Sequence, residues 1–403
     1  MKKIAMILDG EYPKDFRVRK EAESLVEQGL EVVIICPRKK DIPEFEVVNG
    51  VSIYRFGDNY TFVKKGIYDI LGAINFVNPF FKKGIKKALK KYDITHLHVH
   101  DLPLAKTALR FKKKIEGKVV LDLHENYPEG LKVWANWNKS SIIKLKNRIF
   151  FAYRRWLSYE KKMVHQCDLI IAVVEEMKNR LVDLHQVPVE KISVVTNSEK
   201  KEFSNSETNT SLAIQYKDNF LVSYIGGIGP HRGLDTAIQG ITEAKDQIPN
   251  LKLIIVGSGS PAVIAHLKSI IEEKDLDQYV EILGYHPFSE VWALMKHSNV
   301  NIIPHQSNSH TNNTIPHKLF QIMMTDSPLL VSSCAPLKRV VESNDAGFVF
   351  EANSASSFAA SIIQIHNDKK EAQKRSLNAK EAVLKGELNW EVESIRLMNV
   401  YKD

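Results

Sequence analysis

The sequence lacks the features that mark several large protein classes. It has only three cysteines, Cys36, Cys167 and Cys334, which are far apart and odd in number. They form neither a disulfide framework nor a zinc-binding spacing, so we predict three buried thiols. No apolar run approaches the ~20 residues of a membrane-spanning helix. The apolar run after the N-terminal lysines meets Asp9 at once, unlike a signal peptide, so we expect a cytosolic protein that begins with a β-strand.

The chain instead has an uneven surplus of positive charge. Its 403 residues, 44% of them hydrophobic, carry a net charge of +8 and fit two globular domains of ~200 residues. Residues 1–200 contain 37 basic and 25 acidic side chains, whereas residues 201–403 contain 19 and 23. Residues 51–150 alone hold 20 basic and 8 acidic side chains. This asymmetry predicts an anionic partner for the first half.

Short β-branched apolar runs alternate with amphipathic segments of helical length. The runs predict strands at 3–8, 31–36, 51–56, 95–100, 118–123, 168–174, 191–196, 220–225, 251–257, 280–284, 300–304, 328–332 and 347–350. Helices are predicted at 15–28, 260–274 and 290–297. Strands that are apolar at nearly every position and separated by helices are typical of βαβ units with a parallel sheet covered on both faces. We therefore predict an α/β fold.

The polar segment 201–211 has no periodicity and is the natural linker between two Rossmann-like, doubly wound domains at 1–200 and 212–385. A C-terminal helix within 386–403 is expected to pack back on the first domain. Ligands of such sheets bind at the carboxyl ends of the strands. We expect the two domains to face each other across a ligand-binding cleft.

Two segments of the second half favour a phosphate site. A strand, a glycine-rich turn and a helix follow one another over 224–236, and Arg232 stands where it can pair with phosphate. The glycines lack the order of a dinucleotide fingerprint. Pro316 suits the first turn of a second helix, whose polar face would carry Lys318 and Gln321. A helix start with solvated polar residues, and a tight turn with a surface arginine, are the alternatives.

These segments, with 253–259, 280–285, 15–22 and 122–125, resemble in order and spacing the family 4 retaining glycosyltransferases of bacterial surface polysaccharide synthesis, which have the GT-B fold. The resemblance covers nearly the whole chain and depends on the ordered set of motifs. It implies a nucleoside-diphosphate sugar as donor and no cofactor. It implies the following donor-binding residues: Gly226, Gly227, Arg232, Gly284, Tyr285, Asn313, Thr314, Ile315, Pro316, Lys318 and Gln321.

Three positions depart from the family pattern. The family's basic pair falls on Gly227 and Arg232, so one cation is missing, and its paired glutamates fall on Asn313 and Gln321. Amides donate and accept hydrogen bonds, so ribose recognition can survive, but negative charge near the reacting carbon is lost. Either this branch tolerates amides, or the enzyme is slow or inactive.

The first half supplies the expected acceptor side. His100 and His124 lie at predicted strand ends, each beside a carboxylate, and are the candidate catalytic residues. The alternative for each is a hydrogen-bonded structural histidine. Asp9, Gly10 and Arg17 are expected to bind the acceptor. His96, His98 and His100 share one strand face, but we predict no metal site, since helices should cover that face.

Basic and aromatic side chains are interleaved at 76–91 and 134–156. This composition predicts an anionic membrane surface as partner, and a peripheral enzyme at the inner face of the cell membrane. A lysine-rich helix face over a core is the alternative. Aromatic residues cluster with aliphatic ones and no nucleic-acid module is present, so we expect no nucleic-acid partner.

We therefore predict a retaining, metal-independent hexosyltransferase that acts in surface or capsular polysaccharide synthesis. It moves a sugar from a nucleotide sugar to a glycan, which we expect to be carried on a lipid. Two alternatives stay open. One is another GT-B enzyme, such as a nucleotide-sugar epimerase. The other is a weak or inactive partner subunit, suggested by Gly227, Asn313 and Gln321.

Overall fold

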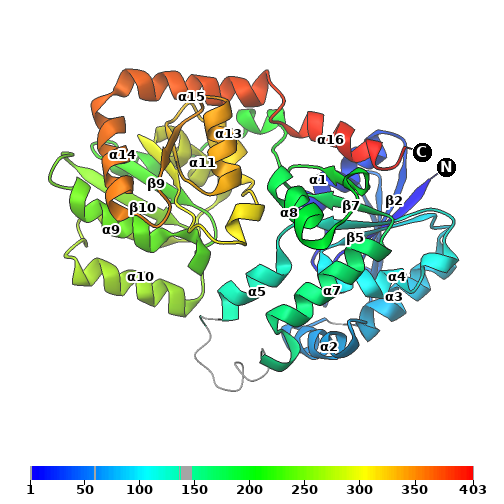
Figure 1. The fold of residues 1–403 in the computed structure, drawn as a ribbon. Helices are drawn as coiled ribbons and strands as arrows, with labels where there is room; N and C mark the ends of the chain where they lie inside the picture. Colours follow the sequence, from blue (N-terminus) through cyan, green and yellow to red (C-terminus); the bar gives the residue numbers. More distant parts are fainter. Residues whose placement is uncertain (1, 59, 136, 138–147, 403) are drawn as a thin grey trace. The chain divides into compact units, whose positions relative to one another are not determined.

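The computed structural model describes residues 2–58, 60–135, 137 and 148–402. The chain forms two compact units (Figure 1). The first comprises residues 1–196 and 393–403, and the second residues 197–392. The chain therefore passes twice from one unit to the other. Residues 201–211, predicted as the linker, belong to the second unit.

The first unit is built on an eight-stranded sheet with the order β3-β4-β2-β1-β5-β6-β7-β8. Its strands are β1 (Lys3–Ile7), β2 (Glu31–Pro37), β3 (Phe45–Val48), β4 (Val51–Phe56), β5 (His96–His100), β6 (Val119–Leu123), β7 (Leu169–Ala172) and β8 (Ile192–Val194). All neighbours are parallel except β3, which runs antiparallel to β4. The carboxyl ends of β1, β5 and β6 therefore meet at one edge.

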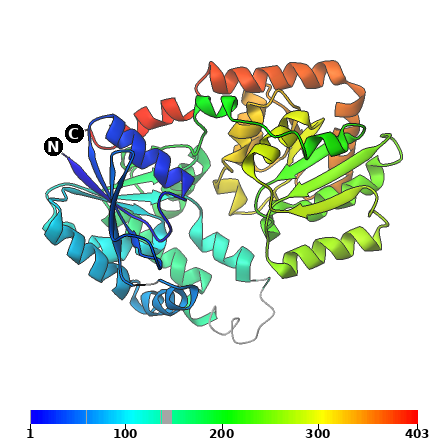
Figure 2. The same cartoon turned by 180° about the vertical axis from the view of Figure 1, so that it is seen from behind.

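Helices lie on both faces of this sheet (Figures 1 and 2). They are α1 (Phe16–Glu27), α2 (Phe62–Asn75), α3 (Pro79–Lys91), α4 (Ala105–Leu109), α5 (Tyr127–Ala135), α7 (Tyr153–Gln166) and α8 (Glu175–His185). The sequence sets the helix starts: the side chains of Asp15, Thr61 and Asn78 accept hydrogen bonds from the first backbone N–H groups of α1, α2 and α3.

The second unit has a six-stranded parallel sheet with the order β11-β10-β9-β12-β13-β14. Its strands are β9 (Phe220–Ile225), β10 (Leu251–Val256), β11 (Val280–Gly284), β12 (Val300–Ile303), β13 (Leu329–Ser332) and β14 (Phe348–Phe350). Its helices are α9 (Leu234–Ala244), α10 (Pro261–Glu273), α11 (Phe288–His297), α12 (Lys318–Met323), α13 (Ala335–Ser343), α14 (Ala355–Asn367) and α15 (Lys369–Leu384). The order switches direction at β9, where a doubly wound sheet binds its ligand.

The last helix, α16 (Trp390–Asn399), begins in the second unit and ends in the first. Beyond it, Tyr401 is buried and its hydroxyl lies 2.5 Å from Nδ1 of His98 on β5. The C-terminal residues are therefore part of the core of the first unit. This contact ties the end of the chain to the sheet strand that carries His100.

The α/β prediction is confirmed, as are the thirteen predicted strands and the three buried cysteines. Sequence reasoning missed β3, a short edge strand whose residues are mostly exposed. The helix predicted to begin at Pro316 begins two residues later, at Lys318. None of the helices that the structure describes has the length and apolar composition of a membrane-spanning segment.

Candidate functional site

In the second unit, Arg232 and Lys318 bring two cations to the carboxyl end of β9. The ammonium group of Lys318 donates a hydrogen bond to the backbone oxygen of Ile225 (3.0 Å) and lies 3.6 Å from the ring centroid of Tyr224. The Nη1 atom of Arg232 lies 2.9 Å from Nε2 of His305. Because a guanidinium only donates, His305 accepts through Nε2 and must be neutral.

The electrostatics around this pair are unbalanced. In the described part of the chain, neither cation forms an ion pair with a carboxylate. Burial and the charge of Arg232 hold the pKa of Lys318 well below its usual range. Burial and the charges of Arg232 and Lys318 also hold the pKa of His305 well below its usual range. A partly buried positive site without a counter-charge is costly unless an anion completes it.

Glycines shape the backbone beside these cations. Gly226 has φ +134°, and a Cβ there would lie 3.5 Å from Nζ of Lys318. Gly233, at φ +65°, immediately precedes α9, and a Cβ there would lie 1.8 Å from the backbone oxygen of Pro304. Gly227 is exposed, and its carbonyl accepts a hydrogen bond from the Tyr224 hydroxyl (2.7 Å). The turn therefore places glycine backbone beside Lys318.

Gln321, expected at the donor ribose, is almost wholly buried and has a carboxylate partner. Its Nε2 donates to Oε2 of Glu199 (3.0 Å), and the same oxygen lies 2.6 Å from Nε2 of His317. The other Glu199 oxygen accepts from the backbone N–H of Lys200 (2.9 Å). The negative charge that Gln321 lacks is thus present in the neighbouring side chain, which sequence reasoning did not identify.

The other predicted donor residues surround the start of α12 and the end of β11. Asn313 donates from Nδ2 to the backbone oxygen of Ser309 (2.7 Å), and the Thr314 hydroxyl donates to that of His310 (3.2 Å). Ile315 is buried and Pro316 is partly exposed. At the end of β11, Gly284 has φ +77° and Tyr285 is exposed.

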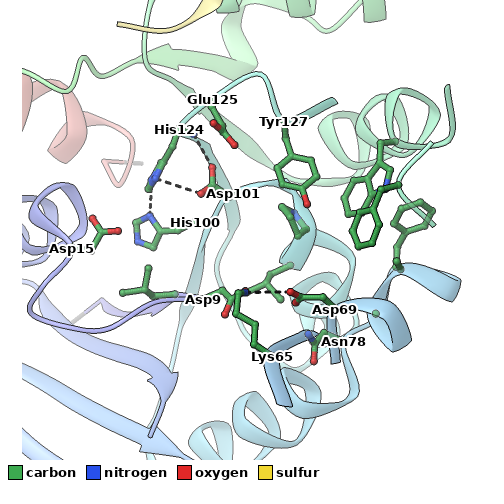
Figure 3. A pocket seen from close by; sticks show the side chains of 18 residues that line it. Asp9, Asp15, Lys65, Asp69, Asn78, His100, Asp101, His124, Glu125 and Tyr127 are labelled. Atoms are coloured by element: carbon green, nitrogen blue, oxygen red, sulfur yellow. Dashed lines mark hydrogen bonds and ion pairs between the residues drawn. The ribbon is translucent and has the colours of Figure 1, made fainter. Parts of the chain in front are cut away.

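In the first unit, a cavity of about 330 Å³ opens at the carboxyl ends of β1, β5 and β6 (Figure 3). Carboxylates and aromatic rings dominate its lining. The carboxylates are Asp9, Asp15, Asp69, Asp101 and Glu125, and the rings are Phe76, Tyr127, Phe151 and Trp156. The ammonium group of Lys65 forms ion pairs with Asp9 and Asp69 (3.5 Å to the latter). Gly10 lines a neighbouring cavity of about 240 Å³, which Asp9 and Lys65 share.

His100 and His124 point toward one another in this cavity (Figure 3). Nδ1 of His100 lies 3.1 Å from Nε2 of His124, which in turn lies 2.8 Å from Oδ2 of Asp122. Burial disfavours the charged form of His124, but Asp101 and Asp122 outweigh it and raise its pKa to about 9. Burial and His98 hold the pKa of His100 well below its usual range. At neutral pH His124 is therefore a cationic hydrogen-bond donor and His100 a neutral acceptor.

Asp101 holds this arrangement in place. Its carboxylate accepts a hydrogen bond from the backbone N–H of His124 (3.1 Å), and its own backbone has φ +66°. Such a conformation costs on the order of 1–3 kcal/mol in a residue other than glycine and is typical of functional sites. Burial raises the pKa of Asp101 to about 6.

Arg17, expected to bind the acceptor, is not among the residues that line the cavity. It is 5% exposed and forms ion pairs of 2.9 Å with both Glu21 and Asp122. Its Nη1 donates to the backbone oxygen of Val195 (3.4 Å). Two buried carboxylates engage the guanidinium, and its direct contact with an acceptor stays a prediction. Arg17 also fixes Asp122, the partner of His124.

Glu21, His98, His100 and Asp122 form a buried group whose ligand atoms lie within 4.8 Å of one another. Two histidines and two carboxylates are a composition that binds transition metals. Here, however, Arg17 already forms ion pairs with both carboxylates. We interpret the group as an ion network in which Arg17 supplies the cation. His96 lies outside it, and its Nδ1 is 2.8 Å from the Thr95 hydroxyl.

Two of the aromatic residues predicted to meet a membrane are buried, and the others whose burial the structure describes are partly exposed. Phe81 and Trp156 are among the core residues, and the ring of Phe76 stacks on Tyr159 at 3.9 Å. Phe80 stacks on Tyr60 (4.7 Å). Contact of these rings with lipid stays a prediction. Residues 138–147 of the second predicted segment, and the side chain of Trp134, lie outside the described part.

Two glycosyltransferase families match the chain, one over each half. The family described as Glycosyltransferase Family 4 matches residues 17–198, and the family described as Glycosyl transferases group 1 matches residues 207–382. An uncharacterized glycosyltransferase of Methanocaldococcus jannaschii, MJ1607, is 22% identical over 94% of this chain and 92% of its own length. The capsular polysaccharide biosynthesis glycosyltransferase CapM of Staphylococcus aureus is 22% identical, with about half of each chain covered (49% and 52%).

Solved structures share the fold over the whole chain. Sucrose-phosphate synthase from Thermosynechococcus elongatus has a TM-score of 0.76 at 17% identity, covering 100% of this chain and 98% of its own. Anabaena HepE, solved in complex with UDP-glucose, has a TM-score of 0.72 at 13% identity, with 100% and 99% covered. These likenesses concern the two-domain architecture alone.

Proposed function

Because the chain belongs to glycosyltransferase family 4 and has the GT-B fold, we propose that it transfers a sugar from a nucleoside diphosphate to a glycan acceptor, with retention of anomeric configuration. The observation that carries this proposal is the pair of uncompensated cations, Arg232 and Lys318, beside the glycine-rich turn. Relatives that act in capsular, amylovoran and colanic acid synthesis support a surface polysaccharide as product.

The donor diphosphate fits the cation pair. An anion placed there would offset the repulsion between Arg232 and Lys318 and raise the depressed pKa of the lysine. Neutral His305 orients the guanidinium without adding a negative charge that would compete with phosphate. Two cations can neutralise the leaving diphosphate as it departs. The buried Glu199–Gln321 pair, one turn further along α12, offers both a carboxylate and an amide to a ribose.

The acceptor fits the cavity of the first unit. Carboxylates bind sugar hydroxyl groups as hydrogen-bond acceptors, and aromatic rings cover the apolar faces of sugar rings. Its lining favours a neutral or amino sugar, since carboxylates outnumber cations there. Cationic His124, whose Nε2 lies 2.8 Å from Asp122, adds positive charge beside the cavity, so its role is electrostatic, whereas His100 stays neutral.

The reaction then needs no enzymic nucleophile. The leaving phosphate can accept the proton of the attacking hydroxyl group while the new bond forms on the same face of the sugar. The protein supplies positioning and a preorganised field. We propose a lipid-linked saccharide as acceptor, which would meet the enzyme at a membrane.

The first test is nucleotide binding, measured as thermal stabilisation by UDP, GDP, ADP, TDP and CDP. A ligand at a hundred times its Kd adds about 2.7 kcal/mol to the free energy of unfolding. We expect one diphosphate, UDP being the first candidate from HepE, to stabilise the protein but not the Arg232→Ala/Lys318→Ala variant. Lys268→Ala/Lys274→Ala, which removes two exposed lysines of α10 and its C-terminus, is the matched control.

A negative result has a defined meaning. If no diphosphate stabilises the wild type, the site has lost its donor, and the chain is an inactive GT-B partner subunit. If the double variant is stabilised as strongly as the wild type, the diphosphate binds elsewhere. A nucleotide sugar that is epimerised without any acceptor would favour the epimerase alternative.

A further inference from the structure

Helix α2 has two faces that differ in chemistry. One face carries Lys65, Asp69, Gly72 and Ala73, all of which line the cavity of the first unit. The opposite face is apolar and exposed to solvent. Its residues and exposed fractions are Val63 69%, Ile67 52%, Leu71 42% and Ile74 57%.

This apolar face is continuous. Positions 63, 67, 71 and 74 follow the spacing of one stripe along a helix. Single exposed apolar residues are normal on a protein surface, but a stripe over the whole length of a helix marks a surface that something covers. Helix α2 is held to the protein by its other face, so the stripe is not explained by packing within the first unit.

Helix α3 follows after Phe76–Asn78 and presents positive charge. Its six lysines, Lys82, Lys83, Lys86, Lys87, Lys90 and Lys91, are all exposed. The helix contains no acidic residue, and its buried positions, Phe81, Gly84, Ile85 and Ala88, lie on the other side. Helices α2 and α3 pack against each other where they meet, and both views show them one after the other along the same edge of the unit (Figures 1 and 2).

We propose that α2 lies in the surface of an anionic membrane, with its apolar face among the lipid chains and the α3 lysines on the headgroups. An exposed apolar stripe next to a row of unneutralised lysines matches an interface that is apolar inside and anionic at its surface. A second copy of this chain would place the two lysine rows near each other. The charge therefore favours lipid over self-association.

The position of α2 connects the membrane to the proposed acceptor cavity. The cavity-lining residues and the apolar stripe are on opposite sides of a single helix, whose diameter is about 10 Å. A saccharide carried on a lipid can therefore enter the cavity while its lipid stays in the bilayer. This consequence depends on the proposed function, whereas the membrane contact itself does not.

The test is co-sedimentation with vesicles of phosphatidylcholine alone and of phosphatidylcholine mixed with phosphatidylglycerol. We expect the wild type to bind the mixed vesicles only, and less at high salt. The variant Ile67→Ser/Leu71→Ser/Ile74→Ser should lose at least tenfold in vesicle affinity. The variant Lys82→Glu/Lys83→Glu/Lys86→Glu/Lys87→Glu should lose more, because each lysine removed from an anionic surface costs roughly fivefold.

The matched control is Ile214→Ser/Leu377→Ser/Ile395→Ser, which removes three residues of similar exposure (56%, 52% and 57%) from elsewhere on the chain. It should bind vesicles as the wild type does. Equal binding by the α2 variant and the wild type would overturn the proposal, as would a wild type that binds neither vesicle. A concentration-dependent dimer that the α2 variant abolishes, without vesicle binding, would assign the stripe to a second copy.

Failure of this proposal is separable from failure of the proposed function. The nucleotide-induced stabilisation depends on the second unit, so the α2 variant should keep it. Unchanged circular dichroism and an unchanged melting temperature without nucleotide would show that the α2 variant is folded. Loss of vesicle binding with retained nucleotide stabilisation is the expected combination.

Discussion

Replacing Gln321 by glutamate would restore the residue type of the family pattern, yet we expect it to damage this protein. The Nε2 of Gln321 lies 3.0 Å from Oε2 of Glu199, so Gln321→Glu would face one carboxylate with another. At an effective dielectric constant of about 20, two unit charges at this separation repel by about 5 kcal/mol. The substitution also removes a hydrogen bond to a charged group.

The folded protein can avoid this repulsion by protonating one of the two glutamates. The cost of that protonation limits how much stability is lost. Protonating one glutamate of ordinary pKa at pH 7 costs about 4 kcal/mol. The free energy of unfolding of the second unit should therefore fall by at most about 4 kcal/mol, with His317 offsetting part of the loss. The shared proton raises a carboxyl pKa in the folded state, so the defect should be large at pH 7 and shrink as the pH falls toward ~4.5.

The assay is urea unfolding followed by fluorescence at pH 7 and pH 5, with the exchange Glu199→Gln/Gln321→Glu as the decisive variant. The exchange restores one amide and one carboxylate in contact, so it should recover most of the lost stability. Gln373→Glu, at an exposed position of α15, is the control and should change little. A Gln321→Glu protein as stable as the wild type, or an exchange variant no better than the single one, would refute the reasoning.

Three further predictions concern charge and backbone geometry. The raised pKa of His124, about 9, should add up to about 3 kcal/mol of stability that is fully present below pH 6.5 and lost as the pH rises through about 9. If the free energy of unfolding of the wild type changes with pH over this range in the same way as that of His124→Gln, this prediction is wrong. Lys318→Met should raise the melting temperature without ligand, because Arg232 no longer repels a buried ammonium. The same variant should lose stabilisation by nucleotide. A lower melting temperature without ligand would argue against an uncompensated site. Gly233→Ala should cost about 3 kcal/mol or more, since its φ is +65° and its Cβ would lie 1.8 Å from a backbone oxygen. Gly66→Ala is the control for calorimetry, because an added Cβ would meet no atom within 4 Å; it should stabilise the protein slightly.

Sequence patterns predicted the strands well because each strand is a short apolar run covered on both faces, which leaves a clear local signal. Strand β3 escaped because it is an exposed edge strand with little apolar burial. The strand ends that carry Asp9, His100 and His124 were predicted for the same reason, since parallel strands end at one edge of the sheet.

The partners of these residues were not predictable in the same way. Glu199 is more than a hundred residues from Gln321 along the chain, and nothing near either position signals the contact. The burial of Arg17 depends on Asp122, which β6 brings beside α1. The apolar stripe of α2 was also missed. The sequence alone does not distinguish an apolar helix face that is exposed to solvent from one that is buried.

The bond between Tyr401 and His98 means that the last residues of the chain help to hold the strand that carries His100. Since residues 393–403 complete the first unit, a fragment that ends at residue 196 lacks part of its own core. The isolated first unit would have to be produced by joining the C-terminal helix to residues 1–196 through a new linker.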